Sequence, residues 1–290
     1  MELDIQHLQK WIGKTQVLTD SMPLFPLRAL SATLDYRRLE FTPGASIPPL
    51  WHWLYFLPTA AQNELSEDGH ARRGGFLPPV PLPRRMWAGG RLEFARALSA
   101  GEVVERRSTI RSVNSKEGRS GSLVFVCVAH EIFDSHGLVL SEEHDIVYRE
   151  NAGAAGAPMS TVIADQRKAD FSRKVNADIT LLFRYSALTF NSHRIHYDHD
   201  YATRIEGYGG LVVHGPLLAT LLMEMLLEQL AGCNVVRFSF KALHPVFAGQ
   251  DFFLNGSLQD RTVQLWIVDR AGRLCMDANA VIDPGISKSS

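Results

Sequence analysis

The chain has 290 residues, 46% of them hydrophobic, which is enough for one large domain or two ordinary ones with a sizeable core. Thirty Lys and Arg residues stand against 31 Asp and Glu residues, a formal net charge of −1. This balance gives no general attraction for nucleic acid or for an anionic membrane, so an anionic ligand must be bound by local basic residues.

The three cysteines are Cys127, Cys233 and Cys275. Their wide spacing, with no CxxC pair, indicates neither a disulfide framework nor a thiolate zinc site. Residues 1–16 lack the apolar core of a signal peptide and the composition of a transit peptide. The longest apolar stretch, 211–230, contains His214 and Glu224, which are costly at the centre of a bilayer. We expect a cytoplasmic protein without a membrane segment.

The first third is rich in proline and irregular. Residues 26–34 predict a short helix with proline near its start. The run LWHWLYFLP, residues 50–58, is dense in aromatics and bounded by prolines, which predicts a buried strand. Residues 62–84 have no usable period and predict an extended loop, a kind of segment that is usually functional or disordered at this length.

Strands are predicted next, over residues 86–150. Turn signals at 116–119 and 135–137 separate them, so this region reads as an antiparallel meander. The small and flexible stretch NAGAAGAPMS, residues 151–160, is the best linker candidate.

The second half is predicted to begin with a strand over 179–189, followed by a polar cluster and a helix over 215–230. The N-terminal end of this helix is apolar on most faces, which is typical of a helix wrapped by a sheet. Three further strand segments are predicted, over 234–250, 251–269 and 272–283.

Each half thus offers a helix and several antiparallel strands, as in a duplicated α+β unit. The two halves show no direct similarity in sequence. We place the boundary between residues 1–155 and residues 156–290.

A polar cluster precedes the helix of the second half. Asn191, His193 and His196 lie within six residues of one another, and His214-Gly215 stands at the helix start. A histidine can act as a base, and a glycine N–H at a helix N-terminus can hold an oxyanion. Together they supply the two groups that thioester chemistry requires.

Simpler readings of the same residues exist. His193, His196 and His199 are spaced three apart, but no carboxylate pairing or thiolate reinforces a metal site, and we predict none. His199 is expected on the surface. Taken alone, Asn191 would be a turn or capping residue.

The second half resembles the MaoC-like (R)-specific enoyl-CoA hydratases. Their signature is matched at Tyr185, Ser186, Ile195, His196, Asp198, Ala202, His214 and Gly215. Two departures fall within the polar cluster, because Asn191 stands where the family has Asp and His193 where it has Asn. Arg194 also replaces the proline of the signature.

The departures point to one branch of that family. FNSHRIHYD, with LPRRMWAGGRLEF and EEHDIVYRE in the first half, resembles the type 2 hydroxyacyl-thioester dehydratases and the mesaconyl-C4-CoA or itaconyl-CoA hydratases. The resemblance covers nearly the whole chain. It implies a double hot dog, in which residues 156–290 form the catalytic half and residues 1–155 the half without the cluster. It also implies a hydro-lyase without a cofactor.

The resemblance also implies roles for individual residues. His196 would be the base, because its ordinary pKa near 6.5 suits proton transfer at neutral pH. Asn191 would position the water through its amide or carbonyl, but it cannot carry a proton as the family's Asp can. The N–H of Gly215 would hold the enolate oxygen.

Substrate binding is assigned to seven residues: Arg84, Arg85, Arg91, Trp87, His193, Arg194 and His214. The arginines would bind the CoA phosphates, and Arg84 or Arg85 would bind a free acyl carboxylate. Taken as a bare pair, these two would be solvated surface charge. His214 is expected to hold the loop ahead of the helix.

Several substrates remain open. A short, branched C5 dicarboxylic enoyl-CoA such as itaconyl-CoA or mesaconyl-C4-CoA leads, followed by the 3-hydroxyacyl-thioester of fatty acid synthesis. A hot-dog protein that binds acyl-CoA without turnover and a hot-dog thioesterase are further alternatives. The expected partner is the CoA thioester alone, without nucleic acid or membrane, and both a monomer and a homo-oligomer fit.

Overall fold

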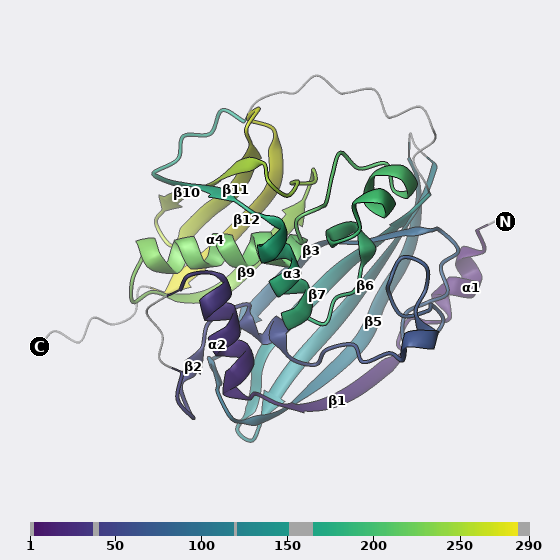
Figure 1. Ribbon diagram of the computed structural model, residues 1–290. Helices are drawn as coiled ribbons and strands as arrows, with labels where there is room; N and C mark the ends of the chain where they lie inside the picture. The colour runs from purple at the N-terminus through teal and green to yellow at the C-terminus, as the bar shows by residue number, and fades with distance from the viewer. Residues whose placement is uncertain (1–2, 37–40, 119–120, 151–164, 284–290) are drawn as a thin grey trace, which may run out of the picture.

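The computed structural model describes residues 3–36, 41–118, 121–150 and 165–283. Ten strands form one antiparallel sheet in the order β1-β5-β6-β7-β3-β9-β12-β11-β10-β8 (Figure 1). The first half supplies β1 (Thr15–Ser21), β3 (Arg84–Phe94), β5 (Val103–Gly118), β6 (Gly121–Asp134) and β7 (Gly137–Arg149). The second half supplies β8 (Phe171–Asn176), β9 (Asn234–Ala242), β10 (Asp251–Gln259), β11 (Thr262–Asp269) and β12 (Leu274–Asp283). A separate pair joins β2 (Ser46–Ile47) to β4 (Leu98–Ser99).

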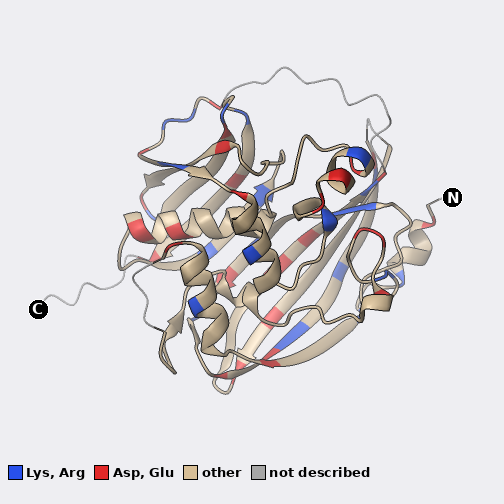
Figure 2. Ribbon diagram, in the orientation of Figure 1, with Lys and Arg blue, Asp and Glu red and all other residues tan. Residues whose placement is uncertain are grey.

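Four α-helices accompany the sheet: α1 (Ile5–Gln9), α2 (Leu24–Thr33), α3 (Ile179–Leu188) and α4 (Gly215–Gln229). Shorter helical turns are η1 (Trp51–Leu54), η2 (Gln62–Glu64), η3 (Arg194–His196) and the π-helical η4 (Tyr201–Ile205). Figure 2 shows acidic and basic residues interspersed over the strands, whereas α2, α3 and α4 are mostly uncharged. No helix within these described ranges is long and apolar enough to cross a membrane.

The two halves meet where β3 pairs with β9. Two glycines make this junction, because β3 is squeezed there between β7 and β9. A Cβ on Gly89 would lie 2.5 Å from the Phe240 carbonyl oxygen, and one on Gly90 would lie 3.0 Å from that of Glu143. The two glycines of β3 therefore reflect close backbone contact, with β9 of the second half at Gly89 and with β7 of the first half at Gly90.

Helix α4 is the core of the second half. Its residues 217–226 are all buried, and it lies across β9 to β12 (Figure 1). This confirms the predicted helix over 215–230 and its position inside a sheet. Sheet residues such as Phe238, Leu254 and Leu265 are at most 1% exposed and complete this core.

Glu224 is a carboxyl group buried on α4. Burial raises its pKa to about 8, although a contact with Trp51 works the other way. The unfolded chain releases this proton near pH 4.5, so stability falls as pH rises from about 4.5 to 8, by at most ~1.4 kcal/mol per pH unit. Glu224→Gln should therefore raise the melting temperature more at pH 8 than at pH 5. An equal change in calorimetric melts at both pH values would contradict a neutral buried carboxyl.

Two predicted strands are wrong. Residues Trp51–Leu54 form the 3-10 helix η1, because Leu50 adopts a left-handed φ of 72° and prolines flank the segment. Trp51, Tyr55 and Phe56 are buried, as predicted, and Trp53 is partly buried. The aromatic residues therefore predicted burial correctly but not the backbone conformation. The strand over 179–189 is helix α3, in which the Asp178 side chain caps the N-terminus by accepting the Leu181 N–H at 2.7 Å.

Most other sequence predictions hold. Helix α2 matches the prediction over 26–34, and residues 62–84 form a loop that contains η2. Strands β5, β6 and β7 form the predicted meander, although β3 pairs with β7 and not with β5. The segment 251–269 is two strands, since the chain turns at Asp260, which has a φ of 55°. The predicted linker, 151–160, and the predicted domain boundary lie outside the described residues.

Candidate active site

His196 ends the turn η3 and is 7% exposed. Its Nδ1–H donates to the Val212 carbonyl at 2.7 Å, which leaves Nε2 as the free acceptor. Burial lowers its pKa to about 4, against the opposing effect of the Val212 hydrogen bond. At neutral pH this ring is therefore an uncharged base with a fixed tautomer, although its pKa is lower than the 6.5 expected from sequence.

His214 holds His196 in place. The two rings stack at 3.6 Å with an interplanar angle of 18°. His214 is fully buried, its Nε2 lies 2.8 Å from the Ser186 hydroxyl, and its ring meets the edge of Tyr185. Tyr185 and Ser186 on α3 therefore hold the His214 ring, which in turn packs on His196. This arrangement is compatible with the predicted role of His214 in holding the loop ahead of the helix.

Gly215 is the first residue of α4, where a backbone N–H has no acceptor within the helix. Pro216, which follows it, has no N–H to offer. A Cβ on Gly215 would meet the Trp87 carbonyl oxygen at 3.7 Å, an ordinary contact, so packing does not require glycine. A glycine here leaves the N–H open to a ligand at the positive end of the helix.

Asn191 follows α3, and its side-chain Oδ1 accepts the His193 N–H at 3.0 Å. The carbonyl end of this side chain is therefore engaged locally. Its amide NH₂ remains the group that can donate to a ligand.

His193 lies between two other imidazoles. Its ring is 5.5 Å from that of His196, edge-on, and 4.2 Å from that of His70. The residue is 6% exposed, and its Nε2 has no hydrogen-bond partner among the described residues. Burial first, and then His70 and His196, lower its pKa, so the ring is neutral at pH 7.

The loop ahead of β3 supplies two polar residues that the sequence analysis missed. His70 Nδ1–H donates to the Asp68 carboxylate at 3.0 Å. The loop is fixed to the histidine segment, because the Arg194 N–H donates to the Asp68 carbonyl at 2.9 Å. Gly69, at a φ of +88°, sits so close that a Cβ would lie 1.8 Å from the Ser192 carbonyl oxygen. The first half therefore contributes to the cluster.

The two adjacent arginines of β3 face different surroundings. Arg84 is buried and paired with Glu206, its Nε 3.1 Å from the carboxylate. The charge of Arg85 contributes to lowering the pKa values of Asp68, His70 and His193, so its guanidinium lies beside the cluster. Of the two candidates for an acyl carboxylate, Arg85 is the one without a carboxylate partner among the described residues.

Basic side chains outnumber acidic ones on the side of the histidine cluster that Arg84 and Arg85 line. The mutually interacting charges are Arg73, Arg84, Arg85 and Arg149 against Asp68 and Glu206. Arg73 donates to the Val80 carbonyl at 2.7 Å, and Arg149 donates to the Tyr208 hydroxyl at 3.2 Å. The wall next to the histidines is thus net positive and suited to an anion.

A family model, that of hydroxyacyl-thioester dehydratase type 2, matches residues 50–248. The chain belongs to this family. Over 237 residues it is 48% identical to a mesaconyl-C4-CoA hydratase of Chloroflexus aurantiacus, covering 82% of this chain and 84% of the relative. The family and this relative place the chain among the hydro-lyases.

Solved structures show the same fold. A MaoC-like dehydratase from Phytophthora capsici has a TM-score of 0.71 at 15% identity, over 97% of this chain and 99% of the other. A Mycobacterium tuberculosis protein described as a double hot dog has a TM-score of 0.57 at 15% identity, over 94% and 97%. The chain is therefore a double hot dog, whose two units join through β3 and β9 into one sheet.

Three other predicted binding residues lie in different surroundings. Arg91 is exposed and pairs with Glu143 and Asp145 on the outer face of the sheet. Arg194 pairs with Asp198 at 2.7 Å and is also partly exposed. Trp87 packs its ring on His144 at 3.9 Å, and its carbonyl oxygen lies near Gly215. Contact of Arg194 and Trp87 with a substrate stays a prediction, whereas the outer-face ion pairs of Arg91 argue against its predicted role.

Two groups of donor atoms in the described part of the chain lie close enough to share a cation. The groups are Asp68, His70 and His193, and His130, Glu142 and His144. In each, the carboxylate already interacts with a histidine, and an arginine, Arg85 or Arg106, acts on the group electrostatically. The arginines disfavour a bound metal ion at both places.

The second group belongs to the core of the first half. The fully buried Glu142 carboxylate accepts the Trp53 N–H at 3.0 Å and lies 3.2 Å from His52 Nε2. His52 and His144 lower the pKa of this carboxyl despite its burial. Because His144 also packs on Trp87, the network supports the strand segment beside Gly215.

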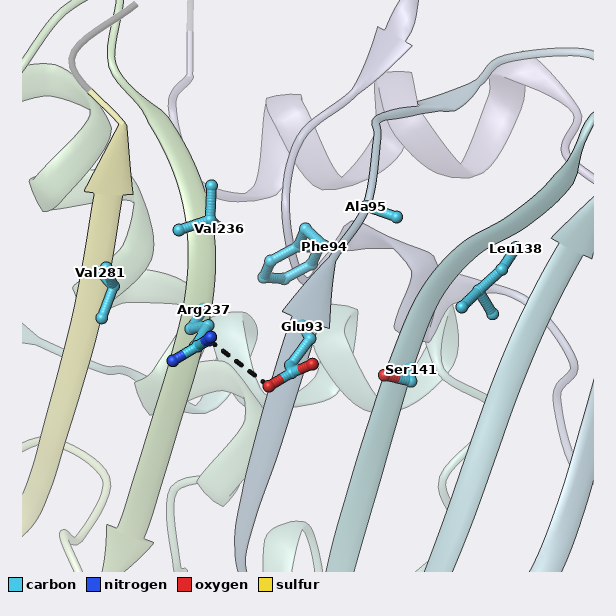
Figure 3. Close-up of a pocket in the computed structure, with 8 residues that line it drawn as sticks. All are labelled: Glu93, Phe94, Ala95, Leu138, Ser141, Val236, Arg237 and Val281. Atoms are coloured by element: carbon cyan, nitrogen blue, oxygen red, sulfur yellow. Dashed lines mark ion pairs between the residues drawn. The ribbon is translucent and has the colours of Figure 1, made fainter.

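Figure 3 shows a pocket of about 380 Å³ whose lining includes none of the histidines of the candidate active site. Its lining includes Glu93 and Ser141, on the face of the sheet opposite the buried Leu92 and Leu140. Its charged residues, Glu93 and Arg237, are exposed and pair at 3.4 Å. None of the residues that line this pocket belongs to the candidate active site around His196.

The low pKa of His196 predicts the acidic limb of the pH profile. The base works in its neutral form, so activity is lost as pH falls through the pKa of the free enzyme. The profile of kcat/KM should therefore stay level from about pH 8 down to about 6 and fall only towards pH 4. Initial rates between pH 4 and 8, with circular dichroism at each pH, test this. A limb near pH 6.5 would contradict a desolvated base.

Proposed function

We propose that this hydro-lyase adds water to a short, branched C5 dicarboxylic enoyl-CoA, with mesaconyl-C4-CoA as the leading substrate. The observation that carries the proposal is the position of Arg85 beside His70 and His193, next to the base His196. The similarity to a mesaconyl-C4-CoA hydratase supports it. The itaconyl thioester is the alternative C5 substrate.

The structure of the substrate explains why an arginine is needed near the base. In mesaconyl-C4-CoA the free carboxylate is attached to C3, the carbon that receives the hydroxyl group. Its cationic partner must therefore lie within a few Å of the attacking water. A guanidinium matches a carboxylate with two parallel hydrogen bonds. An unbranched acyl chain would instead place alkyl groups against this charge, at a desolvation cost.

The chemistry follows from the site groups. The water oxygen forms a bond to C3 while one of its protons passes to His196 Nε2. The electron pair of the C2–C3 double bond moves to the thioester oxygen, which the Gly215 N–H holds as an enolate. His196 then returns the proton to C2, and the enolate collapses to the thioester. Loss of an oxyanion donor of this kind typically costs about 3 kcal/mol.

A second candidate function is the dehydration of a 3-hydroxyacyl-thioester, which the name of the matching family favours. It uses the same groups in the reverse direction on a longer, unbranched chain. Under this alternative, Arg85 would face an anion other than an acyl carboxylate.

A side-by-side turnover assay tests the proposal. Purified protein is given mesaconyl-C4-CoA, itaconyl-CoA and crotonyl-CoA, and the loss of enoyl-thioester absorbance is followed. We expect kcat/KM for mesaconyl-C4-CoA to exceed that for crotonyl-CoA by at least ~100-fold, because crotonyl-CoA lacks the carboxylate that forms charge-assisted hydrogen bonds with Arg85. Preference for crotonyl-CoA would favour the second candidate. Release of free CoA thiol would indicate a thioesterase, and binding without turnover would indicate a binding protein.

We also propose that the reaction needs no metal and takes place in the cytoplasm. The electrostatic influence of Arg85 and Arg106 on the two candidate cation groups supports the first part, and the free cysteines support the second. Dialysis against a chelator should leave the rate of hydration unchanged. Loss of activity that returns on adding zinc, manganese or iron would overturn the metal-free mechanism.

A further inference from the structure

The attacking water has one clear proton acceptor, His196 Nε2, and needs further contacts to fix its direction. Reaction at C3 requires the lone pair of the water to point at that carbon, which a single hydrogen bond does not ensure. In MaoC-like enzymes an aspartate stands at position 191. Here the Asn191 Oδ1 is engaged by the His193 N–H, so this side chain donates to the water through its amide.

His193 has the free atom that this water needs. Its Nε2 is buried without a partner among the described residues, in a residue that is 6% exposed. A buried polar atom without a hydrogen bond is destabilising, so its retention indicates a ligand. The His193 and His196 rings stand edge-on with their centroids 5.5 Å apart, so the two side chains are close enough for one water to contact both.

Two residues of the first half hold the His193 ring. His70 packs on it at 4.2 Å, and the Asp68 carboxylate fixes His70 through Nδ1 at 3.0 Å. The loop that carries them is locked to the segment around His193 by the Arg194 N–H and by the close approach of Gly69 to Ser192. The tautomer and orientation of His70 are therefore set before any ligand binds.

We propose that His193 is a further catalytic residue, which hydrogen-bonds the attacking water through Nε2, and that Asp68 and His70 are its positioning residues. This inference rests on the proposed function only in that water is added to an enoyl thioester. In the step itself, one water proton passes to His196 Nε2 and the oxygen bonds to C3. His193 gains and loses no proton, and His196 returns its proton to C2.

Other roles for His193 fit the structure less well. Burial keeps its ring neutral, and a neutral imidazole that gave up a proton would become an unstable imidazolate. It is therefore not the acid that protonates C2. The neighbouring Arg85 charge also disfavours a metal ion at Asp68, His70 and His193. A hydrogen bond to a neutral water is compatible with both facts.

Four variants separate this role from general damage to the site. His193→Phe and His70→Phe keep a ring for packing and remove the nitrogen atoms, whereas His193→Gln keeps a polar group near the position of Nε2. Asp68→Asn removes the charge that fixes His70. The exposed His199, changed to Phe, is the matched control. Melting temperature and circular dichroism establish that each variant is folded.

The decisive measurement compares hydration with proton exchange. A saturated acyl-CoA without a C3 hydroxyl, such as methylsuccinyl-C4-CoA, exchanges its C2 proton in D₂O by a reaction that needs His196 and the Gly215 N–H but no water at C3. His193→Phe should lower kcat for hydration about 100-fold, with KM changed less than threefold, and keep exchange within threefold of the wild type. His70→Phe and Asp68→Asn should show the same split, at about tenfold for hydration.

Two results would overturn the inference. One is wild-type hydration by His193→Phe, and the other is an equal loss of hydration and exchange, which indicates a structural role. Independently of exchange, His193→Gln should hydrate at least tenfold faster than His193→Phe, and equal rates would also overturn it. If the wild type hydrates crotonyl-CoA and not mesaconyl-C4-CoA, the proposed substrate fails, and crotonyl-CoA with butyryl-CoA tests His193 separately.

Discussion

Replacing His196 by alanine is expected to reduce kcat/KM for hydration by about 10³-fold, within the range that a positioned general base contributes. Its Nε2 is the only one of its ring nitrogens available to water, because Nδ1 is bound to the Val212 carbonyl. Since Asn191 cannot accept a proton, no neighbouring amide can replace the base. Stopped-flow loss of enoyl-thioester absorbance measures the effect.

The control for this change addresses the packing of the site. His196 stacks on His214, so alanine also removes a buried ring contact. His196→Gln retains more volume and should be as inactive as the alanine variant, while His199→Ala should match the wild type. Substantial activity in both His196 variants, with normal melting temperatures, would exclude His196 as the base.

The candidate site in the second half could be proposed from sequence because its signals are local. Asn191, His193 and His196 follow one another within six residues, and Gly215 is marked by the start of a strongly apolar helix. The apolar residues Leu217, Leu218, Leu221, Leu222 and Met225 predicted a buried helix, and the structure has one. Such patterns can be recognised in sequence because residues a few positions apart stay close together in the folded chain.

Residues that reach the site through contacts between distant parts of the chain could not be predicted from the sequence. Asp68 and His70 lie more than 120 positions before His193 in a loop without a period, and only the Asp-Gly-His turn hinted at a fixed structure. Likewise, Arg84 and Arg85 look equivalent in sequence. Their surroundings differ because Glu206, far along the chain, pairs with Arg84. The strand predicted at 179–189 failed for a local reason, because a short apolar run fits both a strand and a helix.

Replacing Arg85 by methionine should reduce kcat/KM for mesaconyl-C4-CoA by about 10²- to 10³-fold, as expected when one partner of a desolvated charge pair is truncated. The loss should appear mainly for substrates with a carboxylate on C3, and activity on crotonyl-CoA should be maintained or raised. Arg85→Lys keeps the charge but not the two-pronged geometry, so an intermediate loss is expected.

Arg91 on the same strand provides the matched control for Arg85. It is an arginine of β3 that lies on the outer face, half exposed and paired with Glu143 and Asp145, so Arg91→Met should leave both substrates unaffected. Because Arg85 contributes to lowering the pKa values of His70 and His193, methionine should also make both histidines easier to protonate. Equal losses on mesaconyl-C4-CoA and crotonyl-CoA would show that Arg85 supports the common chemistry or CoA binding. A loss restricted to mesaconyl-C4-CoA would assign acyl specificity to the first half of the chain, whereas the proposed base, His196, lies in the second half.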